Sequence, residues 1–75
     1  MEEPKQTYGQ ALVRVKFNPN QDDMVYVIKM EYATLIDRHN EAIKDTGDGE
    51  EIRLHKVAIT ELEGACMRSV KAFTK

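Results

Sequence analysis

The residues best suited to bind a ligand lie within one short segment, "FNPNQDDMVYVIK" (residues 17–29). Phe17 and Asn18 stand before a proline, and Lys29 lies in the apolar run that follows. An aromatic ring can stack on a nucleobase, and a lysine ammonium can meet a phosphate as a point charge. Backbone N–H groups at the start of a helix add donors for an anion. These residue types would suit local binding of an anion such as a phosphate.

A purely structural interpretation of the same residues is also open. Phe17 would then be a hydrophobic staple that packs on the following helix. Lys29 would lay its aliphatic stem over apolar surface and keep its ammonium in water. The residues taken alone favour this structural interpretation.

A second polar group lies further along the chain, at Arg53, Lys56 and Thr60. Spacings of three and four residues place these side chains on one face of a helix. An oligomer that brought several copies of this face together would create a positively charged hole. An exposed helix surface without a ligand is the other interpretation, and the residues alone favour it.

Catalytic, metal and cofactor sites are not indicated, so we predict that the protein is not an enzyme and needs no cofactor. His39 and His55 fall within helical patterns, where a packed or exposed histidine is expected more often than a base. Cys66 is the single cysteine, so it cannot form an internal disulfide, and its apolar neighbours indicate burial. No glycine loop matches a phosphate-binding fingerprint, and the acidic spacing does not fit a calcium loop.

Size and charge limit the class of protein. The 75 residues are 32% charged and 41% hydrophobic, which is typical of one soluble domain. The net charge of −2 gives no global positive field, so we expect no binding of long nucleic acid. The apolar runs are far shorter than the roughly 18 residues that indicate a membrane span. The acidic, polar start "MEEPKQT" lacks the pattern of a secretion signal, so we expect a cytoplasmic protein.

The elements that must position these residues begin with an arm. We expect residues 1–7 to be disordered and residues 8–75 to form one domain. The alternation in "YGQALVRVKF" (residues 8–17) predicts a short extended arm. Asn20 is a suitable N-cap, and Pro19 prevents the next helix from extending backward.

Two long helices follow, over about residues 21–44 and 50–73. The turn "DTGDGE" joins them, with Gly47 or Gly49 as the expected C-cap. A short turn between two long helices predicts an antiparallel hairpin, so the expected fold is all-α. The predicted apolar stripes consist of Val25, Ile28, Tyr32, Leu35, Ile36, His39 and Ile43 on the first helix, and of Leu54, Ala58, Ile59, Leu62, Ala65, Cys66, Ser69, Val70 and Phe73 on the second.

Burial predicts self-association. A lone pair of helices covers one stripe on each, whereas the second helix carries apolar residues on more than one face. Chains of this size rarely bury enough surface without a disulfide, a metal or partner subunits. We therefore expect a homo-oligomer, in which Ala58, Ala65 and Ala72 would allow helices to approach closely.

The order of these segments resembles a known family, the phage anti-CBASS cyclic-nucleotide sponges, whose helical-hairpin domain is shared with Thoeris anti-defence sponges. The resemblance covers residues 8–74. The chain has Arg68 and Ser69 where relatives often carry an aromatic residue and alanine, and Asn20 in place of the usual serine. The motifs that carry the resemblance are "FNP", "IK", A-x-L-I-D (residues 33–37), A-x-T-x-x-E (58–63) and M-x-x-V-K-A (67–72).

The resemblance implies a homohexamer that binds cyclic di- and trinucleotide messengers, such as cyclic GMP-AMP, without cleaving them. It would act in the cytoplasm of the infected bacterial host and silence immune signalling. The family's cyclic-dinucleotide site maps to Lys29 and to an aromatic, for which Phe17 is the nearest candidate beside Asn18, with Tyr8 in reserve. The cyclic-trinucleotide site at a three-fold axis would use Arg53, Lys56 and Thr60. The alternative function is a helical protein-interaction module without a nucleotide ligand.

Overall fold

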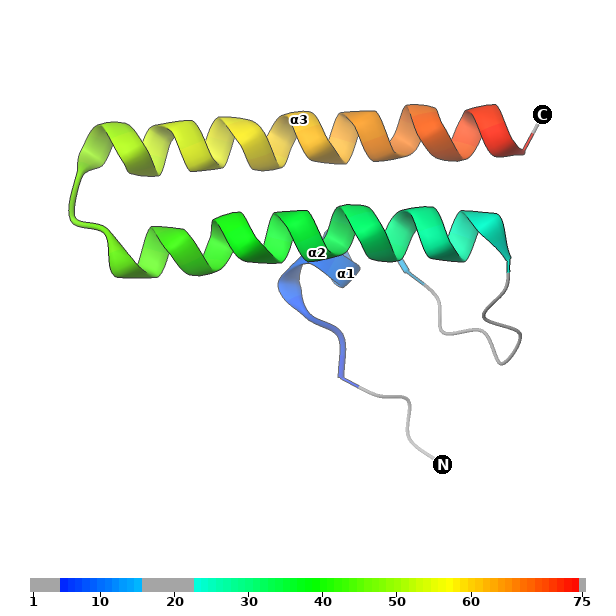
Figure 1. Cartoon of the computed structure of the whole chain (residues 1–75), viewed down its shortest axis with the longest axis horizontal. Helices are drawn as coiled ribbons and strands as arrows, with labels where there is room; N and C mark the ends of the chain where they lie inside the picture. The colour runs from blue at the N-terminus through cyan, green and yellow to red at the C-terminus, as the bar shows by residue number, and fades with distance from the viewer. Residues whose placement is uncertain (1–4, 16–22, 75) are drawn as a thin grey trace.

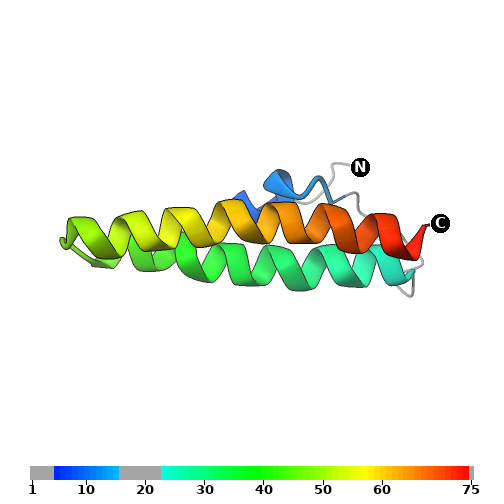
Figure 2. The same ribbon diagram turned by 90° about the horizontal axis from the view of Figure 1, so that it is seen from above.

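The computed structural model describes residues 5–15 and 23–74. This part of the chain is built from three helices, α1 (Tyr8–Leu12), α2 (Met24–Asp45) and α3 (Gly49–Phe73). Figures 1 and 2 show α2 and α3 lying side by side and running in opposite directions, and α1 packs against α2. The predicted all-helical class is confirmed.

The predicted extended arm is wrong over α1, which is helical. Thr7 and Gln10 form a capping box, in which the Thr7 hydroxyl accepts from the Gln10 N–H and the Gln10 side chain accepts from the Thr7 N–H, both at 3.1 Å. These two bonds satisfy donors that a short helix would otherwise leave unpaired. The alternation that suggested a strand instead reflects burial after the helix, because Val13 and Val15 are buried and Arg14 between them is exposed.

A glycine allows α1 to lie directly on α2. The Gly9 N–H donates to Oδ1 of Asp37 at 2.7 Å. A Cβ at Gly9 would stand 2.3 Å from the carbonyl oxygen of Ala33, far inside van der Waals contact. Ala33 itself is buried, so two small residues set the distance between the helices.

The start of α2 differs from the predicted start near residue 21. The structure begins α2 at Met24, capped by Asp23, whose Oδ1 accepts from the Val25 N–H at 2.9 Å. The predicted cap, Asn20, lies outside the described residues.

The predicted glycine C-cap of α2 is wrong. Thr46 ends the helix in an extended conformation, with φ −113° and ψ 143°. Asp48 then caps α3 by accepting from the Glu50 N–H at 3.0 Å. The chain passes from one helix end to the next N-cap without a left-handed residue, so no glycine is required there.

The core is narrow. Among the described residues, Ile36 and Cys66 are the largest fully buried side chains. Of the predicted stripes, Leu35, Leu54 and Phe73 are instead 46%, 54% and 56% exposed. The molecule measures 41 × 33 × 13 Å, which is one layer of helices, so each long helix covers only one side of its neighbour.

Polar contacts fix the alignment of α2 and α3. The Tyr32 and Ser69 hydroxyls are hydrogen-bonded at 3.1 Å. His39 and His55 share a hydrogen bond between their Nδ1 atoms at 2.8 Å, with ring centres 5.1 Å apart. Both bonds need a particular register between the helices, which two apolar stripes alone would specify less sharply.

Candidate functional site

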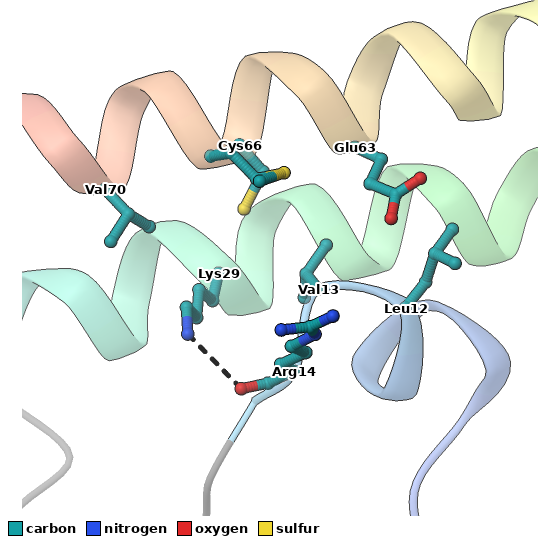
Figure 3. Close-up of a pocket in the computed structure, with 8 residues that line it drawn as sticks. Leu12, Val13, Arg14, Lys29, Glu63, Cys66 and Val70 are labelled. Atoms are coloured by element: carbon teal, nitrogen blue, oxygen red, sulfur yellow. Dashed lines mark hydrogen bonds between the residues drawn. The ribbon is translucent and has the colours of Figure 1, made fainter.

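A hollow of about 260 Å³ lies where the segment after α1 meets the two long helices. Figure 3 shows its side chains converging from all three segments. Its walls are mostly apolar, with two cationic side chains and one carboxylate at the edge. The lining consists of Leu12, Val13, Arg14, Lys29, Glu63, Cys66, Met67 and Val70.

Lys29 reaches the hollow from α2 and is held at its edge. Its ammonium donates to the carbonyl oxygen of Arg14 at 3.2 Å, the dashed contact in Figure 3. The side chain is half-buried, which keeps the charge near the apolar wall. The sequence prediction that singled out Lys29 therefore concerns a residue that lines a hollow.

Arg14 has an unusual backbone. Its φ is 59°, the left-handed region, which costs a residue with a Cβ about 1 kcal/mol. In this conformation its carbonyl contacts Lys29, and its guanidinium points toward the hollow (Figure 3). The backbone therefore turns at Arg14, whose guanidinium is the second cation at the edge of the hollow beside Lys29.

The wall between these charges includes the thiol of Cys66, which is buried as the sequence predicted. Burial raises the pKa of the Cys66 thiol, and the positive charge of Lys29 opposes this shift only in part. The thiol is therefore neutral near pH 7. It contributes a soft, polarizable surface to the hollow.

Of the two aromatic candidates, Tyr8 and Phe17, only Tyr8 falls within the described residues. Tyr8 is the first residue of α1, its side chain is 51% exposed, and it lies outside the lining. Phe17 and Asn18 fall outside the described residues, so their proposed roles stay predictions.

The second candidate group lies on the outer face of α3. Arg53, Lys56 and Thr60 share a shallow depression of about 300 Å³ with Val57 and Glu61. The structure therefore places the three on one exposed surface, as their spacing predicted.

Local contacts already engage part of this second surface. Arg53 pairs with Glu50 at 2.8 Å, and the Thr60 hydroxyl donates to the carbonyl oxygen of Lys56 at 3.2 Å. The Arg53 pair is exposed and contributes little to stability, so a ligand could displace Glu50 at small cost.

Sequence reasoning missed several residues of the hollow, above all Arg14 and Glu63. Arg14 was assigned to a strand, and Glu63 was one of many carboxylates on a helix. The T-x-x-Q pattern at Thr7 was the available signal for α1, since it is a capping-box sequence. No local pattern marks Glu63, because its neighbours in the hollow lie on other segments.

Comparisons with known proteins identify no relative: no family model, no curated protein and no solved structure matches the chain. Within residues 5–15 and 23–74, no three metal-ligating side chains come together. No helix in that part of the chain has both the length and the apolar character needed to cross a bilayer.

Proposed function

We propose that this protein is a non-catalytic sponge. It binds cyclic di- and trinucleotide messengers as a homo-oligomer and thereby blocks CBASS immune signalling in the cytoplasm of an infected bacterium. The observation that carries the proposal is the hollow beside Lys29, where two cations border an apolar wall. A cyclic dinucleotide carries two phosphates and two flat bases, which match cations and an apolar surface respectively.

The size of the hollow supports a site shared between subunits. Its volume of about 260 Å³ lies below the usual range of ligand pockets, roughly 300–1,000 Å³. One protomer would hold about half of a ring that contains two nucleotides. A two-fold related copy would supply a second Lys29 for the second phosphate.

The exposed apolar side chains support self-association. Leu54, Val57, Met67 and Phe73 of α3 are all more than two-fifths exposed. The one-layer shape leaves them without cover inside the protomer. Packing between copies would remove this surface from water, and each fully buried aliphatic or aromatic side chain contributes about 1.5–3 kcal/mol.

The outer face of α3 supports a second site. Three copies of Arg53, Lys56 and Thr60 around a three-fold axis would present six cations and three hydroxyls to a cyclic trinucleotide. The neighbouring Val57 offers apolar contact to the bases.

The test is calorimetric titration with a cyclic dinucleotide, followed by denaturation and chromatography of the ligand. We expect tight binding and recovery of the intact ring. Lys29→Glu should lower affinity at least a hundredfold, because it places a like charge against a phosphate. Lys44→Glu is the matched control, since Lys44 lies on the surface of α2 in an exposed pair with Glu41.

Two results would contradict the proposal. Recovery of a linear product would make the protein an enzyme. Failure of every cyclic di- and trinucleotide to bind or to raise the melting temperature would remove the ligand class altogether.

The alternative is a protein-interaction module, in which the same exposed apolar side chains of α3 would contact a partner protein instead of a second copy. An amphipathic partner helix could bury Leu54 and Val57 in a groove. This function predicts no response to any cyclic nucleotide and stoichiometric capture of one host protein.

A further inference from the structure

We infer that Glu63 selects guanine, so that the hollow beside Lys29 prefers a guanine-containing cyclic dinucleotide. This inference rests on the proposed function, and it adds the identity of the base and the residue that reads it. Glu63 is not among the site residues that the sequence analysis predicted.

Position is the first argument. Glu63 and Lys29 line the same hollow from different long helices. Figure 3 shows them on either side of the view, with Cys66 and Val13 between them. Cys66 lines the hollow together with both residues, and Glu63 lies about one helical turn before Cys66 on α3. The hollow therefore offers an anion site, an apolar wall and an acceptor site.

Availability is the second argument. Within residues 5–15 and 23–74, the ion pairs closer than 4.0 Å are Lys44–Glu41 and Arg53–Glu50, so neither involves Glu63. Glu63 is half-buried, which strengthens any hydrogen bond that its carboxylate accepts. A carboxylate at such a position gains most from a ligand that brings donors.

Base chemistry is the third argument. An ionised carboxylate only accepts hydrogen bonds, and it can accept two in parallel. On the Watson–Crick edge, guanine presents two adjacent donors, N1–H and the N2 amino group. Adenine presents its N6 amino group beside the acceptor N1, whose lone pair would face a carboxylate oxygen. Guanine is therefore the purine that Glu63 can pair with at both oxygens, while the phosphate remains near Lys29.

The size of the effect follows from known base readout. A bidentate contact discriminates against the wrong base by roughly tenfold to a hundredfold. Replacing Glu63 by glutamine removes one acceptor and adds a donor. A glutamine amide can pair with adenine at both positions, so Glu63→Gln should shift the preference toward adenine.

The experiment is calorimetric titration of the full chain with cyclic diguanylate and cyclic diadenylate. We expect the wild type to bind cyclic diguanylate at least tenfold more tightly. Glu63→Gln should lose at least tenfold in affinity for cyclic diguanylate and keep or gain affinity for cyclic diadenylate. Glu31→Gln, an exposed residue of α2 outside the hollow, is the matched control and should keep the wild-type preference.

The outcomes separate this inference from the proposed function. Equal wild-type affinity for the two rings, or a guanine preference that survives Glu63→Gln, would overturn the role of Glu63 and leave the sponge in place. Failure of the wild type to bind either ring, or any other cyclic nucleotide, would overturn the proposed function and the inference with it. Equal wild-type affinity for the two rings would overturn the inference even where the variant does not fold.

Discussion

At the residue scale, the ammonium of Lys29 is held within the protomer by a backbone acceptor. Its bond to the Arg14 carbonyl fixes the ammonium at the edge of the hollow, so less side-chain freedom remains to be lost on binding. A phosphate oxygen could replace that carbonyl as the acceptor at the same ammonium. The left-handed Arg14 is the residue that makes this possible, because its backbone turns the carbonyl toward Lys29.

The buried thiol of Cys66 leads to a prediction about how the stability of the protein depends on pH. Its pKa is raised in the folded protein by burial, so the native state keeps its proton at a pH where the unfolded chain has lost it. The free energy of unfolding should therefore decrease as the pH rises above about 9, through the range up to the folded pKa. Urea denaturation at pH 7.5 and at pH 10 measures this decrease.

The control is Cys66→Ala, which removes the titrating group. The prediction concerns the difference between the wild type and this variant, because contributions from all other groups are common to both. A wild type that loses no more stability than Cys66→Ala between the two pH values would contradict it.

At the scale of elements, the short helix α1 depends on close approach more than on its own length. Five residues are too few for an isolated helix, so its stability comes from the capping box and from packing on α2. The Gly9 contact with Ala33 and Asp37 is the centre of that packing. The segment that follows α1 supplies Val13, Arg14 and one wall of the hollow, so the site depends on this docking.

We expect Gly9→Ala to destabilise the protein by about 1–3 kcal/mol, the usual cost of overpacking a tight contact. The added Cβ would meet the backbone oxygen of Ala33, which cannot move without shifting α2. Gly47→Ala is the control, because nothing lies within 4 Å of a Cβ at that position. Urea denaturation of both variants measures the difference, and equal stability would show that α1 does not dock in this way.

At the scale of the whole molecule, the flat shape leaves apolar side chains of the long helices without cover inside one protomer. A layer 13 Å thick cannot enclose a core on both sides of α2 and α3. The buried apolar side chains of the described residues lie between the helices, while Leu54 and Val57 face outward. The same outward face carries Arg53, Lys56 and Thr60, so self-association and ligand binding would share a surface.

We expect the mass in solution to be a multiple of 8.6 kDa, with a melting temperature that rises with protein concentration. Leu54→Glu should lower both, because it would bury an unpaired charge between copies. Thr34→Glu places the same charge on the exposed surface of α2 and should change neither. Light scattering after size-exclusion chromatography measures the mass. A stable 8.6 kDa species of the wild type at micromolar concentration would remove the basis for a shared site.

The sequence by itself determined the features that depend on neighbouring residues. The 3.6-residue period predicted both long helices, and the spacing of Arg53, Lys56 and Thr60 predicted their common face. These relations act within one or two helical turns, so a linear pattern contains them.

Tertiary structure decided the rest. The Gly9–Asp37 contact joins residues 28 positions apart, and the Lys29–Arg14 contact joins residues 15 apart. Glu63 and Cys66 line the same hollow as Lys29 and Arg14 only because α3 folds back along α2. Whether such side chains share a hollow depends on the distance and register between helices, which packing sets and no local pattern encodes.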